Sequence, residues 1–443
     1  MTFNKSVLLG SAAAILSVAA AQAADLPSRK SAPVEYVRVC SAYGAGFFFI
    51  PGTDTCLKIG GRVRADYAFV PAKDIYSNAA GTTFASKADG QNTLGWEARG
   101  RIDFDARTQT AWGTVQASAG IRLARVTGVL DKEAAASTTS ASQTLEYAFV
   151  RFAGFTFGAS RDNFAFMPSS TYGAGHWASF GNGAKQLAYT ATFGGGVSAT
   201  LALQDYIDTT AGVADASGKS PYYVYNSIPQ INATLRLDQA WGALQVMGAY
   251  ADVAVNTAAD GYDESKGVYA LGAGVKINLP MLANGDALYL TAAYANGMTE
   301  YTTNWTSVKG SAYKRDVGGY TMNHPSLVAE AGGLETVKSW GVAGLLEHYW
   351  APQYRSVLFA SYGQLDAPKG AKSVAWDGKA GFGDATVWNV GTNFAWLPVR
   401  NFEIGVEVIY ARVTQDVVPT AAAAGVSKSD GNVTGRLRIE RTF

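Results

Sequence analysis

The chain lacks the long apolar runs of helical membrane proteins. Beyond its N-terminus, charged and polar residues interrupt every stretch before it reaches the roughly 20 apolar residues that a membrane-spanning helix needs. Methionine (6 residues), histidine (3) and cysteine (2) are scarce among its 443 residues. Glycine (49) and tyrosine (23) are abundant, which favours many short strands and turns over packed helices.

An excess of charge of one sign is absent too. The 36 basic and 35 acidic residues leave a formal net charge of +1, so the balance indicates no nucleic-acid partner. The three histidines, His176, His324 and His348, have no second ligand at metal-binding spacing. No Gly-x-Ser-x-Gly elbow or phosphate-binding loop is found. We therefore expect no enzyme, no cofactor and no metal site.

The N-terminus has the pattern of a secretory signal peptide. Lys5 gives a short positive start, and Val7 to Ala20 is apolar and uncharged. Ala21, Gln22 and Ala23 then place small residues where a signal peptidase cleaves. We predict that residues 1–23 are a signal peptide and that the mature chain begins at Ala24.

The end of the chain alternates between apolar and polar side chains. One face carries Val433, Gly435, Leu437, Ile439 and Phe443, and the other carries Thr434, Arg436, Arg438, Glu440 and Thr442. Successive side chains of a strand point to opposite faces, so this segment predicts a strand with one greasy and one charged face. A soluble β-sandwich shares such alternation. The candidate strands run about 10 to 14 residues, however, which is enough to cross a bilayer when tilted.

The spacing of the candidate strands separates the two fold classes. Sixteen candidates start near residues 56, 93, 111, 144, 155, 186, 196, 229, 242, 267, 286, 338, 353, 386, 401 and 432. Their connections alternate between short turns, such as 107–110, and long loops, such as 70–92 and 299–337. That asymmetry and an even strand number are typical of outer-membrane barrels, which leave no free sheet edge in lipid. We predict an all-β fold, a transmembrane antiparallel β-barrel of 16 strands over residues 56–443.

The two cysteines stand at the entrance to this barrel. Cys40 and Cys56 are the only ones in a chain that we expect to be exported to an oxidising compartment. We expect a disulfide rather than two free thiols, with a structural role as a clamp within the N-terminal segment 24–55.

Charged residues are expected to line the pore. The lumen-facing positions of the first three and the last strand are rich in arginine: Arg62, Arg64, Arg99, Arg101, Arg122, Arg436 and Arg438. Closing the barrel brings the last strand beside the first, so these arginines form one basic wall. Charged rings set ion preference in wet pores. The alternative is that the arginines pair with neighbouring carboxylates and only solvate the interior.

The segment before the first strand carries a family resemblance. Three features resemble the alphaproteobacterial porin family of rhizobia and brucellae. They are the cysteine pair, the run Phe49-Ile50-Pro51-Gly52-Thr53-Asp54-Thr55-Cys56 and the run Phe155-Thr156-Phe157-Gly158. The resemblance implies a homotrimer of sixteen-stranded barrels with the third long loop, Asp162 to Lys185, folded into the pore. Asp162, its only carboxylate, is then expected at the constriction. It also implies that Phe443 is part of the address read by the outer-membrane barrel insertion machinery.

These observations predict an outer-membrane porin for passive diffusion of small hydrophilic solutes and ions, surrounded by lipid and lipopolysaccharide. Weak anion preference is our hypothesis for its selectivity. Alternatives are a channel specific for a sugar or an anion, and a barrel with a surface-adhesion role through its longest loop. An active transporter would need about 22 strands and a folded plug. Glu403 and Glu407 are interpreted as solvated lumen groups, not a catalytic pair, so an outer-membrane enzyme is the remotest reading.

Overall fold

The computed structural model describes residues 38–69, 94–128, 130, 140–173, 182–205, 213–215, 222–226, 228–257, 262–302, 327–330, 333–368, 382–417 and 429–443. The predicted signal peptide, residues 1–23, lies outside these ranges. Strands dominate the described part of the chain, with two 3₁₀ turns, η1 (Ser41–Tyr43) and η3 (Thr299–Tyr301). In these residues no helix is long and apolar enough to span a membrane.

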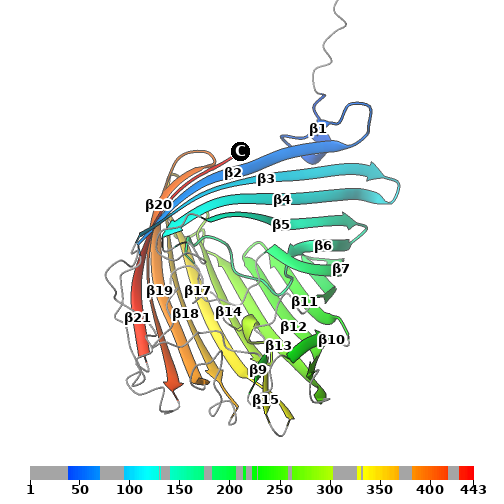
Figure 1. The fold of residues 1–443 in the computed structure, drawn as a ribbon. Coiled ribbons are helices and arrows are strands. Elements are labelled where there is room, and N and C mark those ends of the chain that lie inside the picture. Colours follow the sequence, from blue (N-terminus) through cyan, green and yellow to red (C-terminus); the bar gives the residue numbers. More distant parts are fainter. Residues whose placement is uncertain are drawn as a thin grey trace, which may run out of the picture.

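Sixteen antiparallel strands form one closed barrel (Figure 1). They are β2 (Cys56–Phe69), β3 (Leu94–Thr110), β4 (Gly113–Gly128), β5 (Ser140–Phe152), β6 (Phe155–Arg161), β7 (Asn182–Gly194), β8 (Val197–Gln204), β11 (Gln230–Gln239), β12 (Gly242–Thr257), β13 (Tyr262–Asn278), β14 (Ala287–Asn296), β17 (Lys338–Ala351), β18 (Tyr354–Asp366), β19 (Phe382–Val399), β20 (Phe402–Val417) and β21 (Ser429–Thr442). The last strand pairs with the first, from Arg62 opposite Thr442 to Phe69 opposite Gly435. The predicted architecture is confirmed, and every predicted strand start lies within five residues of an observed one.

The two ends of the barrel differ as the sequence predicts. Tight turns join β3 to β4, β5 to β6 and β7 to β8 at one end, which we call the turn end. Longer connections lie at the opposite end, the loop end. Among their described parts, β9 (Val213–Asp215), β15 (Leu327–Glu330) and β16 (Gly333–Thr336) form a separate three-stranded sheet. A short strand, β10 (Tyr222–Asn226), extends the barrel wall by pairing with β12.

The turn between β5 and β6 requires positive φ at both of its residues. Ala153 has φ of 50° and Gly154 has φ of 86°. Two-residue hairpins favour this geometry because its twist matches that of the flanking strands. Glycine adopts it freely and alanine does not, so this hairpin is held by the pairing of its strands, which begins directly with Phe152 opposite Phe155.

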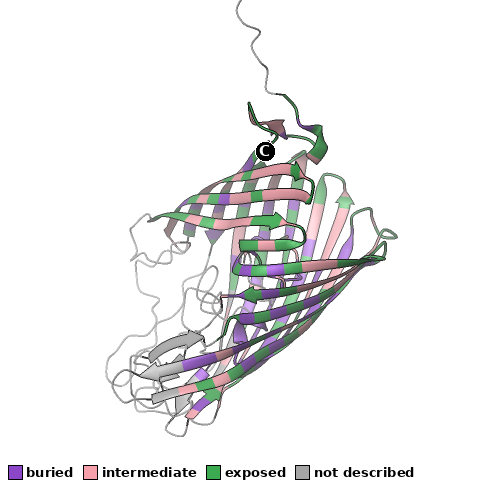
Figure 2. Cartoon of the chain, turned by 90° about the vertical axis from the view of Figure 1, so that its right-hand side faces the viewer, coloured by how far each residue is buried: buried purple, intermediate pink, exposed green. Residues whose placement is uncertain are grey.

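The outer face of the barrel is apolar. Exposed and buried residues alternate along the strands (Figure 2). On β12, for example, Leu244 and Val246 point outward and are exposed, whereas Gln245 and Met247 point inward and are buried. A continuous apolar outer belt suits contact with lipid rather than with water.

The core lies inside the barrel, not between layers. Inward-facing Met247, Ala251 and Val268 pack with Phe164 and Phe166, which come from the segment after β6. These two aromatic side chains are almost completely buried. Part of the lumen is therefore filled by loop residues, and another part is lined by charged side chains.

Candidate functional site in the barrel interior

The third long loop crosses the lumen and binds the opposite wall. It leaves β6 at Asp162, and the backbone N–H of Tyr172 donates to Glu407 Oε2 on β20 at 2.7 Å. The Asn393 side chain on β19 donates to the Ser170 carbonyl at 3.0 Å. The inward fold expected from the resemblance is confirmed for residues 162–173. His176 and Trp177 of the same loop lie outside the described residues.

Among the described residues of this loop, Tyr172 is the most heavily anchored. Its carbonyl accepts from Arg436 Nη1 at 2.7 Å and from Arg438 Nη2 at 3.1 Å, and its hydroxyl donates to Glu403. Burial and the nearby Glu403 carboxylate raise the pKa of the Tyr172 phenol. Its ring also lies 4.6 Å from the Arg438 guanidinium, a cation–π distance. The tip of the described loop is thus fixed by charged groups on β20 and β21.

Glu407 is buried, and the expectation that it is a solvated lumen group is wrong. Only 2% of the residue is exposed, and its two oxygens accept the backbone N–H groups of Tyr172 and Gly173. Backbone donors that would otherwise be unpaired inside the barrel are satisfied in this way. The sequence pattern shows a carboxylate on the inner face but not the loop that reaches it.

Inward-facing glycines make room for the loop side chains. A Cβ on Gly272 or Gly274 of β13 would overlap the rings of Phe164 and Phe166. On β20, a Cβ on Gly405 would overlap the Tyr172 hydroxyl. The loop is therefore seated on strand positions that lack side chains.

Asp162 lies at the root of the loop and is 1% exposed. Its Oδ1 accepts from the Phe164 N–H at 3.0 Å, from Gln204 at 3.1 Å and from Asn232 at 3.0 Å. Burial raises the pKa of this carboxyl. We expected Asp162 at the pore surface, and its burial argues against that role: it holds the loop root instead.

The predicted arginines meet on one inner surface of β21, β2, β3, β4 and β5, and we call these seven arginines, with the carboxylates within 4.0 Å of them, the charged wall. Arg62 stands opposite Arg101, and Arg64 opposite Arg99, across β2 and β3. The next strand adds Arg122 opposite Arg101. On the other side, β21 places Arg436 and Arg438 beside β2.

Each of these seven arginines has a carboxylate within 4.0 Å. The Asp66 side chain is inaccessible to solvent, and its carboxylate accepts two hydrogen bonds of 2.8 Å from Arg438, one from Nε and one from Nη2. The remaining pairs are Arg436 with Asp66, Arg64 with Glu440, Arg99 with Glu97, Arg101 with Asp103 and Glu146, Arg122 with Glu146, and Arg62 with Glu146 and Glu440. The pairing alternative that the sequence left open thus describes these contacts, with seven arginines against five carboxylates.

Glu146 is the functional candidate that the sequence analysis missed. In the pairing of β4 with β5, Tyr147 faces Gly120 and Leu145 faces Ile121, so Glu146 is the extra residue of a β-bulge. A bulge re-aims a side chain, and here both Glu146 and Tyr147 reach the charged wall, where Tyr147 donates to Asp103 at 2.6 Å. The signal was available: this candidate strand alternates poorly, as a bulged strand must.

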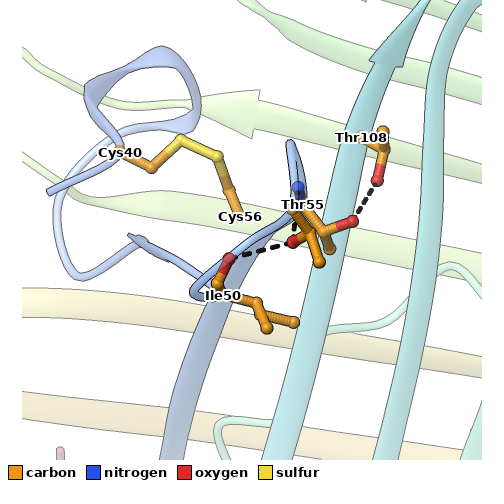
Figure 3. Close-up of a disulfide and its surroundings, with 6 residues drawn as sticks. Cys40, Ile50, Thr55, Cys56 and Thr108 are labelled. Carbon is orange, nitrogen blue, oxygen red and sulfur yellow. Dashed lines mark hydrogen bonds between the residues drawn. A yellow bond between two sulfur atoms is a disulfide. The ribbon is translucent and has the colours of Figure 1, made fainter. Parts of the chain in front are cut away.

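The N-terminal segment is closed by the expected disulfide (Figure 3). Cys40 and Cys56 are bonded, with their Cα atoms 5.9 Å apart, and both are buried with Phe47. Thr55 next to Cys56 shares a hydrogen bond of 2.9 Å with Thr108 at the end of β3. The segment lies at the turn end as an extension of β2 (Figure 1), where its two-residue strand β1 (Phe48–Phe49) pairs with β2.

Phe443 completes the seam between the last and first strands. Its backbone exchanges two hydrogen bonds with Gly61, at 3.0 and 3.1 Å, while the residue is 62% exposed. Among the described residues no group of three or more His, Cys, Asp or Glu side chains is arranged to hold a metal ion.

Comparisons with known proteins agree with this geometry. The sequence model of a family described as "Porin subfamily" matches residues 25–435. Porin Omp2b of Brucella abortus (strain 2308) and of Brucella suis biovar 1 (strain 1330) are each 32% identical over 263 residues, covering 56% of this chain and 66% of the relative. The outer membrane channel DcaP of Acinetobacter baumannii superposes with a TM-score of 0.60 at 15% identity, over 89% of this chain and 99% of that chain. At that identity the likeness concerns the fold alone.

Proposed function

Because this chain belongs to the porin subfamily, as an integral β-barrel of the bacterial outer membrane, we propose that it forms a water-filled channel for passive diffusion of small hydrophilic solutes and ions. The observation that carries the proposal is the partial exposure of charged side chains inside the barrel. The side chains of Arg62, Arg101 and Arg122 are 20 to 26% exposed on the charged wall. Exposed charges in an interior support a lumen that holds water.

The third loop would form the constriction of this channel. Its described part packs against β12, β13 and β14 and reaches β20 and β21, so it would narrow the lumen. Solutes would then pass between the loop and the charged wall. The seven arginines of that wall outnumber its five carboxylates, which supports a weak preference for anions, and Arg62, Arg64, Arg99, Arg101, Arg122, Arg436 and Arg438 would set it.

The partners proposed for this barrel follow from its surface and its family. Residues 1–23 would direct export, and residues 24–55 would form a segment on the periplasmic side. The exposed Phe443 ring at the barrel seam would be read by the insertion machinery. The apolar outer belt would contact lipid, lipopolysaccharide and two further copies of the chain in a homotrimer.

Flux of graded sugars through the purified protein in liposomes tests diffusion. We expect rates that fall with sugar size and do not saturate, and saturation by one sugar would instead favour a specific channel. In planar bilayers, the reversal potential across a potassium chloride gradient should have the sign of a weak anion preference. A clear cation preference would contradict the role given to the charged wall.

A further inference from the structure

A second polar region of the lumen lies at the turn end, apart from the charged wall. It is a cavity of about 520 Å³ between the β5–β6 hairpin, β7 and the root of the third loop, with Tyr43 of the N-terminal segment at its edge. Three arginines line it, Arg107, Arg151 and Arg161, together with four threonines, a serine, two glutamines and an asparagine. No carboxylate is among the described residues that line it.

One of the three arginines is already neutralised. Arg107 donates to Asp105 through Nε at 3.0 Å and through Nη2 at 2.7 Å. Gln116 donates to the same carboxylate at 3.1 Å. With these three hydrogen bonds, Asp105 is committed to its neighbours on β3 and β4.

In the described part of the chain the other two arginines have no carboxylate within 4.0 Å, and Asp105 and Asp162 act on them only from a greater distance. Arg151 rests on the ring of Phe149, with its guanidinium carbon 4.5 Å from the ring centroid, and makes no hydrogen bond there to a protein acceptor. Arg161 donates one hydrogen bond of 2.8 Å, to the Met167 carbonyl. This differs from the charged wall, where every arginine has an acid within 4.0 Å.

The polar residues around these arginines are preorganised. Gln186 donates to Ser160 at 2.5 Å and accepts from Asn163 at 2.7 Å, which fixes three neighbouring side chains of the cavity floor. Thr156 lies opposite Arg151 across β5 and β6. Hydroxyl and amide groups of this kind bind the hydroxyls of a sugar, whereas the planar fork of an unpaired arginine matches the oxygens of a phosphate.

The two arginines mark two ends of the cavity. Arg151 on β5 pairs with Thr156 on β6, and Arg161 lies five residues farther along β6. Five residues of strand span about 17 Å, so the two arginines are separated by about that length along the barrel wall. Arg161 stands beside the loop, and Arg151 stands beside the turn. A phosphate leaving the constriction would therefore meet Arg161 first and Arg151 next.

We propose that this cavity is a binding station for phosphorylated solutes, with the phosphate held first by Arg161 and then by Arg151, and the rest of the solute held by the threonine and amide side chains between them. The proposal rests on the diffusion channel proposed above and names a solute class that it would favour. Binding here would be weak and reversible, because the cavity is open to the lumen and conduction requires release.

Block of the chloride current in planar bilayers tests the station. Glucose 6-phosphate and inorganic phosphate should reduce the current in a saturable manner, and glucose at equal concentration should not. Arg151→Gln should raise the half-blocking concentration of glucose 6-phosphate roughly tenfold, since one charge-assisted contact contributes about that factor. Arg151→Lys, which keeps the charge but loses the fork, should give an intermediate value.

The matched control is Arg400→Gln, which removes one exposed arginine from another turn at the same end of the barrel. Arg400→Gln should leave the half-blocking concentration of glucose 6-phosphate unchanged. If Arg400→Gln raised this concentration as much as Arg151→Gln does, the effect would come from the general loss of positive charge, and the proposal would be overturned. A block by inorganic phosphate as strong as that by the sugar phosphate would overturn the role of the threonine and amide side chains.

Glucose flux through liposomes separates this proposal from the proposed function. If glucose passes the wild-type channel and glucose 6-phosphate gives no saturable block, the station is wrong and the diffusion channel stands. If glucose does not pass, the channel itself is wrong. Insertion of Arg151→Gln into planar bilayers as conducting channels shows that this variant has folded.

Discussion

The two sides of the barrel interior are built from different chemistry. The charged wall on β21, β2, β3, β4 and β5 carries arginines and carboxylates with partly exposed side chains. The apolar wall, which we define as the inward-facing residues of β12, β13, β14, β17 and β18, carries mainly alanine, glycine, valine and leucine. Several of its members, such as Ala251, Val268 and Ala270, have no exposed surface.

The difference follows from what faces each wall. Small residues on the apolar wall leave a hollow, and Phe164, Phe166 and Tyr301 from two loop segments fill it. In the described part of the chain, aromatic loop residues do not fill the space before the charged wall in this way, and its arginines and carboxylates pair with one another. The apolar wall therefore holds the root of the third loop, whereas the charged wall contacts the loop farther along, through Arg436 and Arg438 at Tyr172.

The largest expected effect is the loss of the aromatic anchor on the apolar wall. Phe164 is fully buried and its ring lies 4.4 Å from that of Tyr301 between centroids. Phe164→Ala should lower the free energy of unfolding by about 3–5 kcal/mol, because the loop root cannot fill the cavity that is left. Urea unfolding in detergent, at low and high salt, should give the same loss at both.

A graded control accompanies that variant. Phe164→Leu retains most of the apolar volume and should cost about 1.5 kcal/mol or less. A loss that shrinks at high salt would mean that the loop is held mainly by charge, and the distinction between the two walls would fail.

The next effect concerns the most deeply buried ion pair of the charged wall. Asp66 receives Arg438 through two hydrogen bonds of 2.8 Å and lies 3.5 Å from Arg436. Asp66→Asn leaves two buried guanidiniums without their carboxylate, so we expect a loss of about 3 kcal/mol in unfolding free energy. The same urea titration measures it.

The partly exposed pair of Asp105 and Arg107, which lies on β3 between the charged wall and the turn end, is the matched comparison. Its side chains are 22% and 31% exposed, so Asp105→Asn should cost less than about 1 kcal/mol, and less still at high salt. Equal losses in Asp66→Asn and Asp105→Asn would show that burial does not distinguish the pairs.

Alternation predicts the charged wall well and the apolar wall poorly. The alternation of polar and apolar side chains predicts which arginines of β2 and β3 face the lumen. The register of the two strands then brings together Arg62, Arg64, Arg99 and Arg101. On β12, by contrast, both faces carry apolar residues, such as the inward Ala249 and the outward Val246. The alternation of polar and apolar side chains therefore does not predict which face of this strand a loop covers. Long-range contacts such as Tyr172 with Glu407 have no local signal at all.

The stability effect expected at the loop root depends on pH and vanishes in acid. Burial raises the pKa of Asp162, so the folded state favours the protonated carboxyl. Below the ordinary carboxyl pKa of about 4 the group is protonated in both states, and its contribution to stability is fully present. As the pH rises above that value the unfolded chain ionises first, and stability falls until the raised pKa of the folded state is passed.

Asp162→Asn removes this titration while keeping an oxygen that accepts from the Phe164 N–H and from Asn232. The variant and the wild type should therefore unfold at similar urea concentrations in acid. At neutral pH the variant should be the more stable, by about 1.4 kcal/mol for each unit by which the pKa is raised. Unfolding midpoints over a pH series measure the divergence. A wild type that gains stability over the variant as the pH rises would show that the donors around Asp162 outweigh its burial, and the loop root would then belong with the charged wall rather than with the apolar one.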